Sequence, residues 1–391
     1  MKIAATGDNH LNEKATVAGK LVLGPDGRSI RAADRERCLM AVADGAVGHA
    51  VDVALNSGDL FDSARPTPAE YVIAEAYVDR ICRAGIPLVI VADQHGLPQS
   101  PLEAHALAPL IGRHENLYVL LRPEVITVET HAGPLQIAGL PWPRRSMLAA
   151  KEEAATLSPE ALNALISEKL GLIVHALLAQ RTPGIPCILL GHVMLREAIF
   201  SNDGTAPDTG QIILSAEAFA AFDAAVLGDI HRAQSFGPEG RIFYAGSTDR
   251  VKADEEHEPK GWWLVKMEGA RAGGYCFEKE LIETPARRYC TLTPDELIHS
   301  EPYPEIVYRI KTKITQEEYE ALAPHLARWR EATPLFAEQV EISRQTRARS
   351  EEMRGDLDPE TNLKLWHQVN ERPEDFGELL EAHREIAGMA K

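Results

Sequence analysis

The chain has 391 residues, of which 45% are hydrophobic and 25% charged, a composition typical of a globular protein large enough for two domains. Its formal net charge of −17 at pH 7 argues against a protein that coats nucleic acid by bulk electrostatics, so a polyanionic substrate would have to be held locally, by metal ions or a few arginines. The N-terminal residues lack a signal-peptide pattern, and no stretch approaches the roughly 18 to 20 apolar residues of a membrane helix, so we expect a cytoplasmic protein without a membrane span.

Short apolar runs alternate with helical patterns in the first part of the chain. Strands are predicted at Ile3–Gly7, Val51–Ser57 and Pro87–Ala92. Helices are predicted at Ala33–Ala50, Pro68–Ala84 and Leu102–Ile111, the second of them after a Thr-Pro start signal. Leu21–Ile30, with its Pro-Asp-Gly turn, reads as a surface hairpin. The alternation of strand and helix indicates βαβ units and a mainly parallel sheet.

The middle of the chain adds more strands and one long helix. Strands at Leu117–Leu121, Val125–Glu129 and Leu135–Leu140 follow one another at short spacing, as in a meander. The long helix, Ser158–Leu178, starts with Ser-Pro-Glu, which is typical of a cap followed by proline in the first turn. Further strands are predicted at Pro186–Leu190, Ala224–Leu227, Arg241–Tyr244 and Gly261–Met267.

Near residue 285 the pattern changes. A strand at Ile306–Ile314, a helix at Gln316–Ala332 and a strand at Glu338–Ser343 precede a polar helical tail over roughly Asp358–Ala390, interrupted at Pro373. The tail has apolar residues at helical spacing but little of its own to bury them against. A helical hairpin packed on its own domain and a helix offered to a partner both fit this pattern.

Five of the predicted strands end in carboxylate, amide or imidazole side chains, usually just after a glycine. The residues at these ends are Asp8 and His10 (GDNH), Asp59 and Asp62 (GDLFD), Asp93, Gln94 and His95 (ADQHG), His192 (LLGH), and Asp229 and His231 (VLGDIH). Because the carboxyl ends of parallel strands share one edge of a sheet, where ligand sites form, we expect these side chains to lie together. Unrelated surface turns are the alternative, and five concordant strand ends argue against it.

This set of side chains suits divalent metal ions. Carboxylates, imidazoles and amides without a thiolate are ligands for hard or borderline cations such as Mn²⁺, with Mg²⁺ as a second choice, and a carboxylate can bridge two ions. Two such ions stabilise the attacking and leaving oxygens of an in-line displacement at phosphorus. The sequence therefore predicts a hydrolase for a phosphate ester.

The order of these motifs resembles that of the calcineurin-like metallophosphoesterases. ALNSGDLFD, LLGHVM, VLGDIHRAQ and residues 244–267, YAGSTDRVKADEEHEPKGWWLVKM, are similar to the SbcD branch, the nuclease subunit of a DNA-break-processing complex that pairs with the SbcC ATPase. The resemblance implies a four-layer α/β sandwich, with two mixed β-sheets flanked by helices, over residues 1–285. It also implies a small α+β capping and DNA-binding domain over residues 286–346 and a helical arm over residues 347–391 that binds the ATPase.

Position by position, the resemblance assigns ligands to two metal ions. The first ion would be held by Asp8, His10, Asp59 and His231. Asp59 would bridge to the second ion, whose other ligands would be Gln94, His192 and Asp229. His95 would be a catalytic residue beside the phosphate. Asp62 stands where some relatives carry a histidine that positions the DNA, and a cap at the start of the next helix is an equal alternative for it.

The implied activity is that of a DNA exonuclease and endonuclease that works in the 3′-to-5′ direction, through a hydroxide that the two metal ions activate. DNA ends, an SbcC-like ATPase and a second copy in a homodimer would be the partners, in DNA repair and recombination. Arg65, Arg232 and Arg250 flank the motif loops and could contact DNA phosphates, although arginines in such places are often only solvated.

The sequence departs from this family's pattern around the second metal ion. Relatives read GNHD and GHIH where this chain reads DQHG and GDIH, so Gln94 and Asp229 replace an asparagine and a histidine, and Gly96 removes an acid beside His95. Gln94 and Asp229 still offer oxygen atoms, and an oxygen-rich, more anionic site favours Mn²⁺ or Mg²⁺. A degenerate second site is the opposing interpretation, because ligands must be placed within a fraction of an ångström.

Two other functions therefore stay open. The first is a phosphodiesterase or phosphatase for a smaller substrate, which would not require the region after residue 285. The second is a DNA-end-binding scaffold whose second metal site has decayed. Digestion of a labelled duplex and hydrolysis of a small phosphodiester would separate the three.

Overall fold

The structure is a computed structural model that describes residues 1–97, 104–143, 148, 156–200, 213–271, 274–343, 358–369 and 376–386. The chain divides into two compact units. The first consists of Met1–Ile310 and Trp329–Glu338, and the second of Lys311–Arg328 and Gln339–Lys391. The points of division lie inside the segment 286–346 that was predicted to be a capping domain, and the predicted domain bounds stay a prediction.

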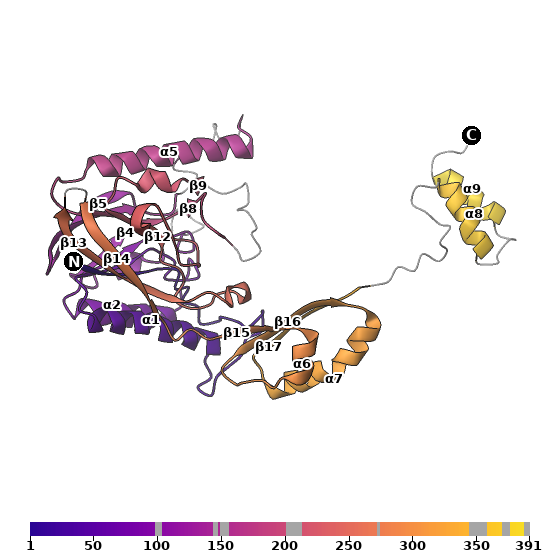
Figure 1. The fold of residues 1–391 in the computed structure, drawn as a ribbon. Helices are drawn as coiled ribbons and strands as arrows, with labels where there is room; N and C mark the ends of the chain where they lie inside the picture. The colour runs from indigo at the N-terminus through magenta and orange to yellow at the C-terminus, as the bar shows by residue number, and fades with distance from the viewer. Residues whose placement is uncertain are drawn as a thin grey trace. The chain divides into compact units, whose positions relative to one another are not determined.

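The first six-stranded sheet has the strand order β14-β13-β1-β2-β3-β4. Its parallel strands are β1 (Lys2–Thr6), β2 (Val53–Asn56), β3 (Leu88–Val91) and β4 (Leu117–Leu120). The antiparallel strands β13 (Gly261–Arg271) and β14 (Gly274–Glu283) extend the sheet beyond β1. Helices α1 (Ile30–Gly48) and α2 (Pro68–Cys82) cover its outer face (Figure 1). Ser29 caps α1, and Thr67 with Glu70 forms a capping box on α2.

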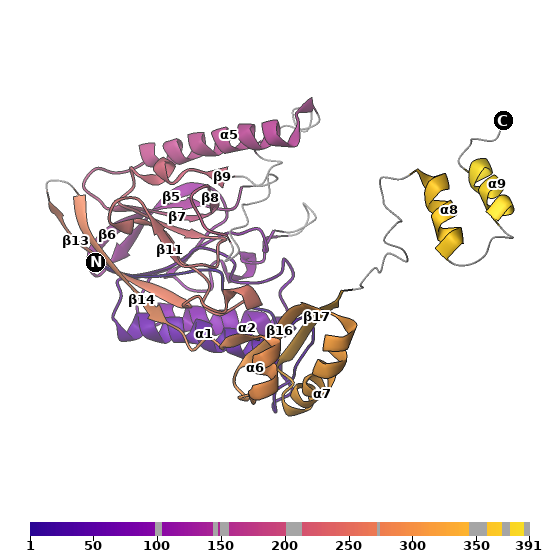
Figure 2. The same cartoon turned by 45° about the vertical axis from the view of Figure 1, so that its right-hand side comes forward.

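The second six-stranded sheet has the strand order β11-β12-β10-β7-β6-β5. Its parallel strands are β6 (Gly133–Leu140), β7 (Cys187–His192), β10 (Ala224–Gly228) and β12 (Ile242–Tyr244). The edge strands β5 (Glu124–Thr130) and β11 (Gln234–Phe236) are antiparallel to their neighbours. Helix α5 (Pro159–Ala179) lies over the outer face of this sheet, and the two sheets stack between α5 and the pair α1 and α2 (Figure 2).

The alternation of side chains along the strands explains these layers. In β1, Ile3 contributes to the core between the sheets and Ala4 to the core under α1 and α2. In β7, Leu190 contributes to the core between the sheets and Leu189 to the core under α5. Since successive residues of a strand face opposite sides, three apolar layers separate four layers of secondary structure. The prediction of two mixed sheets flanked by helices is confirmed.

Helix α5 corrects one expectation. The helix has 21 residues, and an 18-residue window of it is apolar enough to cross a membrane by length and composition, whereas no such stretch was expected from the sequence. Ile166, Leu170, Val174 and Leu177 are buried and pack on the second sheet. The apolar face of α5 therefore has a partner within the sandwich.

A second expectation, the helix at Leu102–Ile111, is wrong for the part that the structure describes. Residues 104–107 are not helical, and only the short 3₁₀ helix η1 (Ala108–Leu110) forms. Pro109 cannot donate a backbone hydrogen bond and is therefore poorly placed inside an α-helix. Leu102 lies outside the described residues. The other short elements here are β8 (Met194–Leu195), β9 (Ile213–Leu214), η2 (Ala216–Phe219), η3 (Pro238–Gly240) and η4 (Ala253–Glu255).

The last part of the chain contains a small three-stranded sheet and two helices after it. The sheet has the order β15-β16-β17, with β15 (Tyr289–Leu292) parallel to β16 (Val307–Ile314) and β17 (Phe336–Ile342) beyond it. Helices α6 (Pro294–His299) and α7 (Gln316–Ala332) accompany these strands. In the tail, α8 (Pro359–Val369) and α9 (Phe376–Ile386) are joined by an ion pair of Arg384 and Glu360 at 2.8 Å. Pro373 lies outside the described residues.

Candidate metal centre

The predicted ligand residues lie at the carboxyl ends of five strands from both sheets. Asp8 and His10 follow β1, Asp59 follows β2, and Gln94 follows β3, all in the first sheet. His192 ends β7, and Asp229 and His231 follow β10, in the second sheet. The polar edges of the two sheets thus meet, and both sheets contribute candidate ligands to one centre.

The backbone at these ligands adopts an unusual conformation. The φ angles of Asp8, His10, Asp59 and Asp229 are 48°, 52°, 52° and 95°, in the region that residues other than glycine rarely occupy. Each such residue costs about 1–3 kcal/mol and persists only where the surroundings hold it. Ligand placement is therefore maintained against local backbone preference.

Hydrogen bonds between the first two motif loops supply that support. The backbone N of Asp8 donates to the carbonyl oxygen of Gly58 at 3.0 Å, and that of His10 to Asp59 at 2.8 Å. Asn56 donates through Nδ2 to Oδ1 of Asn9 at 2.8 Å and accepts from the backbone N of Gly58 at 3.0 Å. Gly58 has a φ of 104°, and a Cβ there would lie 2.5 Å from Nδ1 of His192.

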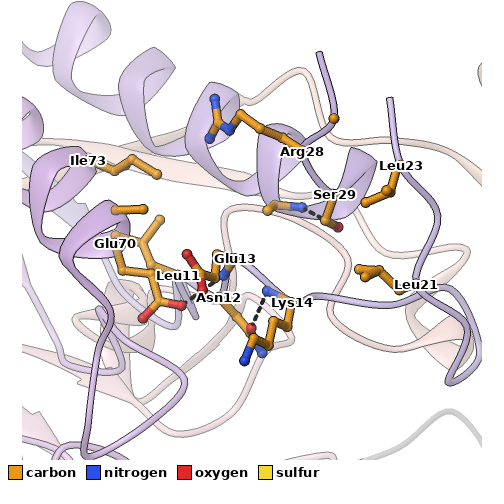
Figure 3. A pocket seen from close by; sticks show the side chains of 13 residues that line it. Leu11, Asn12, Glu13, Lys14, Leu21, Leu23, Arg28, Ser29, Glu70 and Ile73 are labelled. Carbon is orange, nitrogen blue, oxygen red and sulfur yellow. Dashed lines mark hydrogen bonds between the residues drawn. The ribbon is translucent and has the colours of Figure 1, made fainter. Parts of the chain in front are cut away.

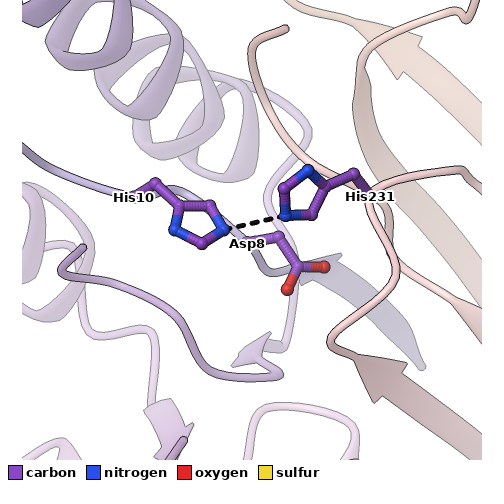
Figure 4. A group of neighbouring side chains, drawn as sticks. All are labelled: Asp8, His10 and His231. Carbon is purple, nitrogen blue, oxygen red and sulfur yellow. Dashed lines mark hydrogen bonds between the residues drawn. The ribbon is translucent and has the colours of Figure 1, made fainter. Parts of the chain in front are cut away.

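Asp59 occupies the middle of the cluster. Its Oδ2 lies 3.5 Å from Nε2 of His10, 3.6 Å from Nε2 of His192 and 3.7 Å from Nε2 of His95. Three groups of side chains have ligand atoms within 4.8 Å of one another, and they are Asp8, His10 and His231; His10, Asp59 and His95; and Asp8, Asp59 and His192. Figure 4 shows the first group, with a ring nitrogen of His10 directed at a ring nitrogen of His231 beside Asp8. Each group could hold a metal ion.

Three imidazoles, of which those of His10 and His192 are buried, present the same nitrogen to this centre, because each places Nδ1 against an oxygen acceptor. For His10 the acceptor is Asp62 Oδ1 at 3.1 Å, for His192 the carbonyl oxygen of Ser57 at 2.6 Å, and for His231 Glu255 Oε1 at 2.7 Å. These contacts place the proton on Nδ1 and leave Nε2 with a lone pair. The Nε2 atoms of His10 and His231 are only 2.9 Å apart, so they need a cation or an additional proton between them.

Buried polar atoms without partners point to the same chemistry. Within the described residues, five such atoms belong to predicted ligands, and they are Asp8 Oδ2, Asp59 Oδ1, Gln94 Oε1, His192 Nε2 and Asp229 Oδ2. Leaving a buried polar atom unpaired costs about 1–3 kcal/mol, and more for a charged one. All five can donate an electron pair to a metal, so the residues present fit a divalent metal centre.

The electrostatics of the cluster agree with a need for positive charge. Burial, followed by the charges of Asp93, Asp8 and Asp229, raises the pKa of Asp59 well above its usual range. Burial also raises the pKa of Asp229 and lowers that of His10 to about 4. For His231, burial lowers the pKa, but the hydrogen bond and charge of Glu255 outweigh it and the net shift is upward. A group of carboxylates in such a place is unfavourable unless cations neutralise it.

The two altered positions contact each other. Gln94 donates through Nε2 to Asp229 Oδ1 at 2.8 Å, which leaves Gln94 Oε1 and Asp229 Oδ2 unpartnered. At Gly96, an added Cβ would lie 2.3 Å from Cε1 of His105, so that ring occupies the room an acid would need. The Asp93 carboxylate accepts from the backbone N of Gly96 at 2.7 Å and so stabilises this loop.

His95 and Asp62 lie at the edge of the centre. The His95 side chain is 38% exposed and its ring packs edge-on against that of His10, with ring centroids 5.1 Å apart. Asp62 orients His10 and also accepts from Nδ2 of Asn12 at 2.9 Å. The cap of α2 is Thr67, so Asp62 is not the helix cap that the sequence left open.

The three arginines predicted to contact DNA lie in different settings. Arg65 is exposed on the loop after β2, and Arg232 is partly exposed beside His231. Arg250 donates from its guanidinium to the carbonyl oxygens of Glu255, Glu256, Arg287 and Glu258, at 2.9 to 3.3 Å. The guanidinium of Arg250 thus binds carbonyl oxygens of the following turn and of Arg287, an arrangement that disfavours the predicted phosphate contact.

Glu255 and Lys260 are site residues that the sequence reasoning missed. Glu255 binds His231, and Lys260, which is buried, lies 2.8 Å from Glu255 Oε2 and donates to the carbonyl oxygen of His231 at 3.1 Å. The sequence feature that could have pointed to them is the dense charge of the stretch KADEEHEPK, and such a stretch is typical of a solvated surface.

A separate pocket of about 350 Å³ lies beside the loop after β1 (Figure 3). Leu21, Leu23 and Ile73 give it an apolar lining, and an antiparallel bridge between Leu23 and Ser29 forms the predicted hairpin on one side. None of the predicted metal ligands lines this pocket.

No protein-family model matches the chain, and no curated protein gives a significant match. Among solved structures, the chain is similar to the sulfate thiohydrolase SoxB of Thermus thermophilus in complex with glycerol, with a TM-score of 0.38 and 13% sequence identity. This match covers 84% of the present chain but only 61% of SoxB. It is also similar to a dimetal phosphatase of Danio rerio, with a TM-score of 0.36 and 9% identity over 72% of this chain and 97% of that chain. Similarity of this size carries no argument about activity, so function has to be argued from the site itself.

Proposed function

We propose that this protein is a metal-dependent phosphodiesterase that acts on DNA ends, the nuclease subunit of a complex with an SbcC-like ATPase. The observation that carries the proposal is the convergence of unpartnered, electron-donating atoms from five strand ends. A buried cluster of this kind is explained by bound cations and by no packing role. The motif order at the same strand ends supports a phosphate ester as the substrate.

The residues divide into two sets of ligands. Asp8, His10, Asp59 and His231 would hold one divalent ion, and Asp59, Gln94, His192 and Asp229 the other. Mn²⁺ is the expected ion, with Mg²⁺ as an alternative, since oxygen ligands outnumber nitrogen ligands. When bound, the two ions supply positive charge at the phosphoryl oxygens and make water a stronger nucleophile at neutral pH.

The chain's own residues would bind and orient the substrate. His95 is exposed at the edge of the cluster, where its imidazole can donate a proton to a phosphate oxygen or to the leaving oxygen. Arg65 and Arg232 are the remaining candidates for phosphate contacts. Asp62 and Glu255 would keep His10 and His231 in the required tautomer.

The two proposed protein partners have separate tests. The hairpin of α8 and α9 is amphipathic in sequence and would bind the ATPase, and a second copy of the chain would complete a homodimer. Pull-down of the ATPase by the full chain, but not by a chain ending at residue 343, would test the first. Sedimentation equilibrium of the full chain would test the second.

The decisive experiment is Mn²⁺-dependent digestion of a 5′-labelled DNA duplex, compared with hydrolysis of bis-p-nitrophenyl phosphate. We expect shortening of the duplex from its 3′ ends, with EDTA abolishing it. Asp59→Asn should abolish turnover, because it removes the charge shared by both ligand sets, and its circular dichroism spectrum should match the wild type. Hydrolysis of the small ester without cleavage of DNA would favour a small-molecule phosphodiesterase.

The contact between Gln94 and Asp229 supports one alternative, a DNA-end-binding scaffold with a single metal ion. In that case the hydrogen bond between them would replace the second ion. Metal stoichiometry from anomalous scattering in a crystal grown with Mn²⁺ distinguishes the two, since we expect two ions and the scaffold requires one.

A further inference from the structure

Two adjacent glutamates hold two different parts of the first unit. Glu255 ends the short helix η4, and Glu256 is its C-cap residue. Glu255 Oε1 lies 2.7 Å from Nδ1 of His231. The Glu256 carboxylate accepts hydrogen bonds from the backbone N of Thr291 at 2.9 Å and from its hydroxyl at 2.6 Å. Thr291 belongs to β15, so one turn of chain contacts both a candidate metal ligand and the small sheet's first strand.

The contact with His231 is rigid. Glu255 Oε2 accepts from the backbone N of Val251 at 3.0 Å and pairs with Nζ of Lys260 at 2.8 Å. Lys260 also donates to the carbonyl oxygen of His231 at 3.1 Å and to Oγ of Ser247 at 3.0 Å. Both the ring and the backbone of His231 are therefore fixed by this buried pair, which leaves its imidazole little freedom to move independently of η4.

The contact with β15 is equally specific. Arg309 donates to the hydroxyl of Thr291 at 3.0 Å, and this bond directs the hydroxyl proton toward Glu256. Arg250 donates through Nε to the carbonyl oxygens of Glu255 and Glu256 and through Nη1 to that of Arg287, two residues before β15. A shift of β15 thus breaks these bonds or moves η4 with it.

We propose that Glu255 is a positioning residue for the metal centre and that the bond between Glu256 and Thr291 couples the position of β15 to His231. A ligand that displaces β15 would then change the affinity of the centre for its metal. The inference rests on the proposed function in that it requires a divalent ion at His231. It goes further by naming a regulatory path through residues that touch neither metal nor substrate.

The test is Mn²⁺ affinity, measured by isothermal titration calorimetry on the full chain for wild type, Glu255→Gln, Thr291→Val and Thr293→Val. Loss of an orienting partner of a ligating histidine lowers metal affinity about 10- to 100-fold, which we expect for Glu255→Gln. Thr291→Val should weaken binding by roughly five-fold or more, a typical coupling between sites. Thr293→Val is the matched control, because Thr293 exchanges its side-chain hydrogen bonds with Glu296 in the capping box of α6.

The outcomes separate this inference from the proposed function. Unchanged Mn²⁺ affinity in Thr291→Val overturns the coupling, and unchanged affinity in Glu255→Gln overturns the positioning role. Wild-type protein that binds Mn²⁺ with the expected ranking of variants, but cleaves no phosphodiester, overturns the proposed function and supports the inference. Equal losses in Thr291→Val and Thr293→Val would indicate a general loss of stability and would overturn the coupling.

A second readout needs no metal. In ¹⁵N-histidine-labelled, metal-free protein, long-range ¹H–¹⁵N spectra report which ring nitrogen carries the proton. We expect wild-type His231 to be protonated at Nδ1, and Glu255→Gln to show exchange between forms. If Glu255→Gln fails to fold, the spectra of Thr291→Val provide the test, because Thr291 is partly exposed and its substitution should be tolerated. An unchanged His231 resonance in both variants contradicts the proposal.

Discussion

Asp59 is the residue on which the centre depends most. Its carboxylate lies near three imidazoles, and its Oδ1 is buried without a partner. Burial and three neighbouring carboxylates raise its pKa, so the ionised carboxylate destabilises the metal-free protein. Sites of this kind gain function at the expense of stability.

Asp59→Asn should therefore raise the melting temperature of the metal-free protein. Because the folded-state pKa of Asp59 lies above its unfolded value, its protonated form stabilises the fold at low pH, and that contribution is lost as the pH rises through the folded-state pKa. The difference in melting temperature between variant and wild type should grow as the pH rises above the range in which an ordinary aspartate titrates. Calorimetry in EDTA measures it, and a difference that shrinks with pH would contradict this account.

Gln94 and Asp229, the two candidate ligands that differ from the expected motifs, form a hydrogen bond with each other. We expect Asp229→His to shift the metal preference toward Zn²⁺ relative to Mn²⁺ by about ten-fold, since imidazole suits Zn²⁺. In a double-mutant cycle of Asp229→His and Gln94→Asn, the effects of the two substitutions on the free energy of Mn²⁺ binding should be coupled by about 0.5–3 kcal/mol. Competition titrations provide these values, and strictly additive effects would show that the pair does not act as a unit.

The clustering of the candidate ligands could be predicted because each follows a short apolar run with a clear strand pattern. Asp8, Asp59 and His192 share one centre although 184 positions separate the first from the last. Glu255 and Lys260 could not be predicted, because their role depends on contacts with His231 that no local pattern encodes. Arg250 was misread for the same reason, since only the fold reveals that its donors are used by carbonyl oxygens.

At the scale of elements, the approach of α1 to the first sheet depends on a glycine. A Cβ at Gly45 would lie 2.6 Å from Cζ2 of Trp262, a fully buried side chain of β13. In α5, by contrast, a Cβ at Gly171 would meet nothing within 4 Å. The two glycines therefore have the same helix propensity but opposite surroundings.

Gly45→Ala should destabilise the protein, because overpacking costs about 1–3 kcal/mol and outweighs the gain of about 1 kcal/mol in helix propensity. Gly171→Ala is the matched control and should stabilise by up to about 1 kcal/mol. Urea unfolding measures both. A stabilised Gly45→Ala variant would mean that Trp262 can move aside.

Elements with strong periodicity and a start signal were predicted well, as α2 and α5 illustrate with their caps at Thr67 and Ser158. The helix predicted over Leu102–Ile111 failed because apolar spacing was weighed above Pro109. Strand β14 was missed because its sequence, GYCFEKELIE, mixes charged and apolar residues and is specified by pairing with β13.

At the scale of the whole molecule, metal binding should stabilise the folded chain, because the unfolded chain cannot gather these ligands. At free Mn²⁺ 100 times above its dissociation constant, the gain is about 2.7 kcal/mol. We expect Mn²⁺ to raise the melting temperature and EDTA to reverse the rise, as scanning calorimetry can measure. Asp59→Asn should show almost none of this rise, and an equal rise in that variant would place the ion elsewhere.

The division of ligands between two sheets has a consequence for synthesis of the protein. Asp8, His10 and Asp59 leave the ribosome long before His192 and His231. A nascent chain that has formed only its first βαβ units lacks His192, Asp229 and His231, so it could complete neither of the two proposed ligand sets. If the proposed centre binds metal ions, both ligand sets would therefore be complete only after the second sheet has been translated.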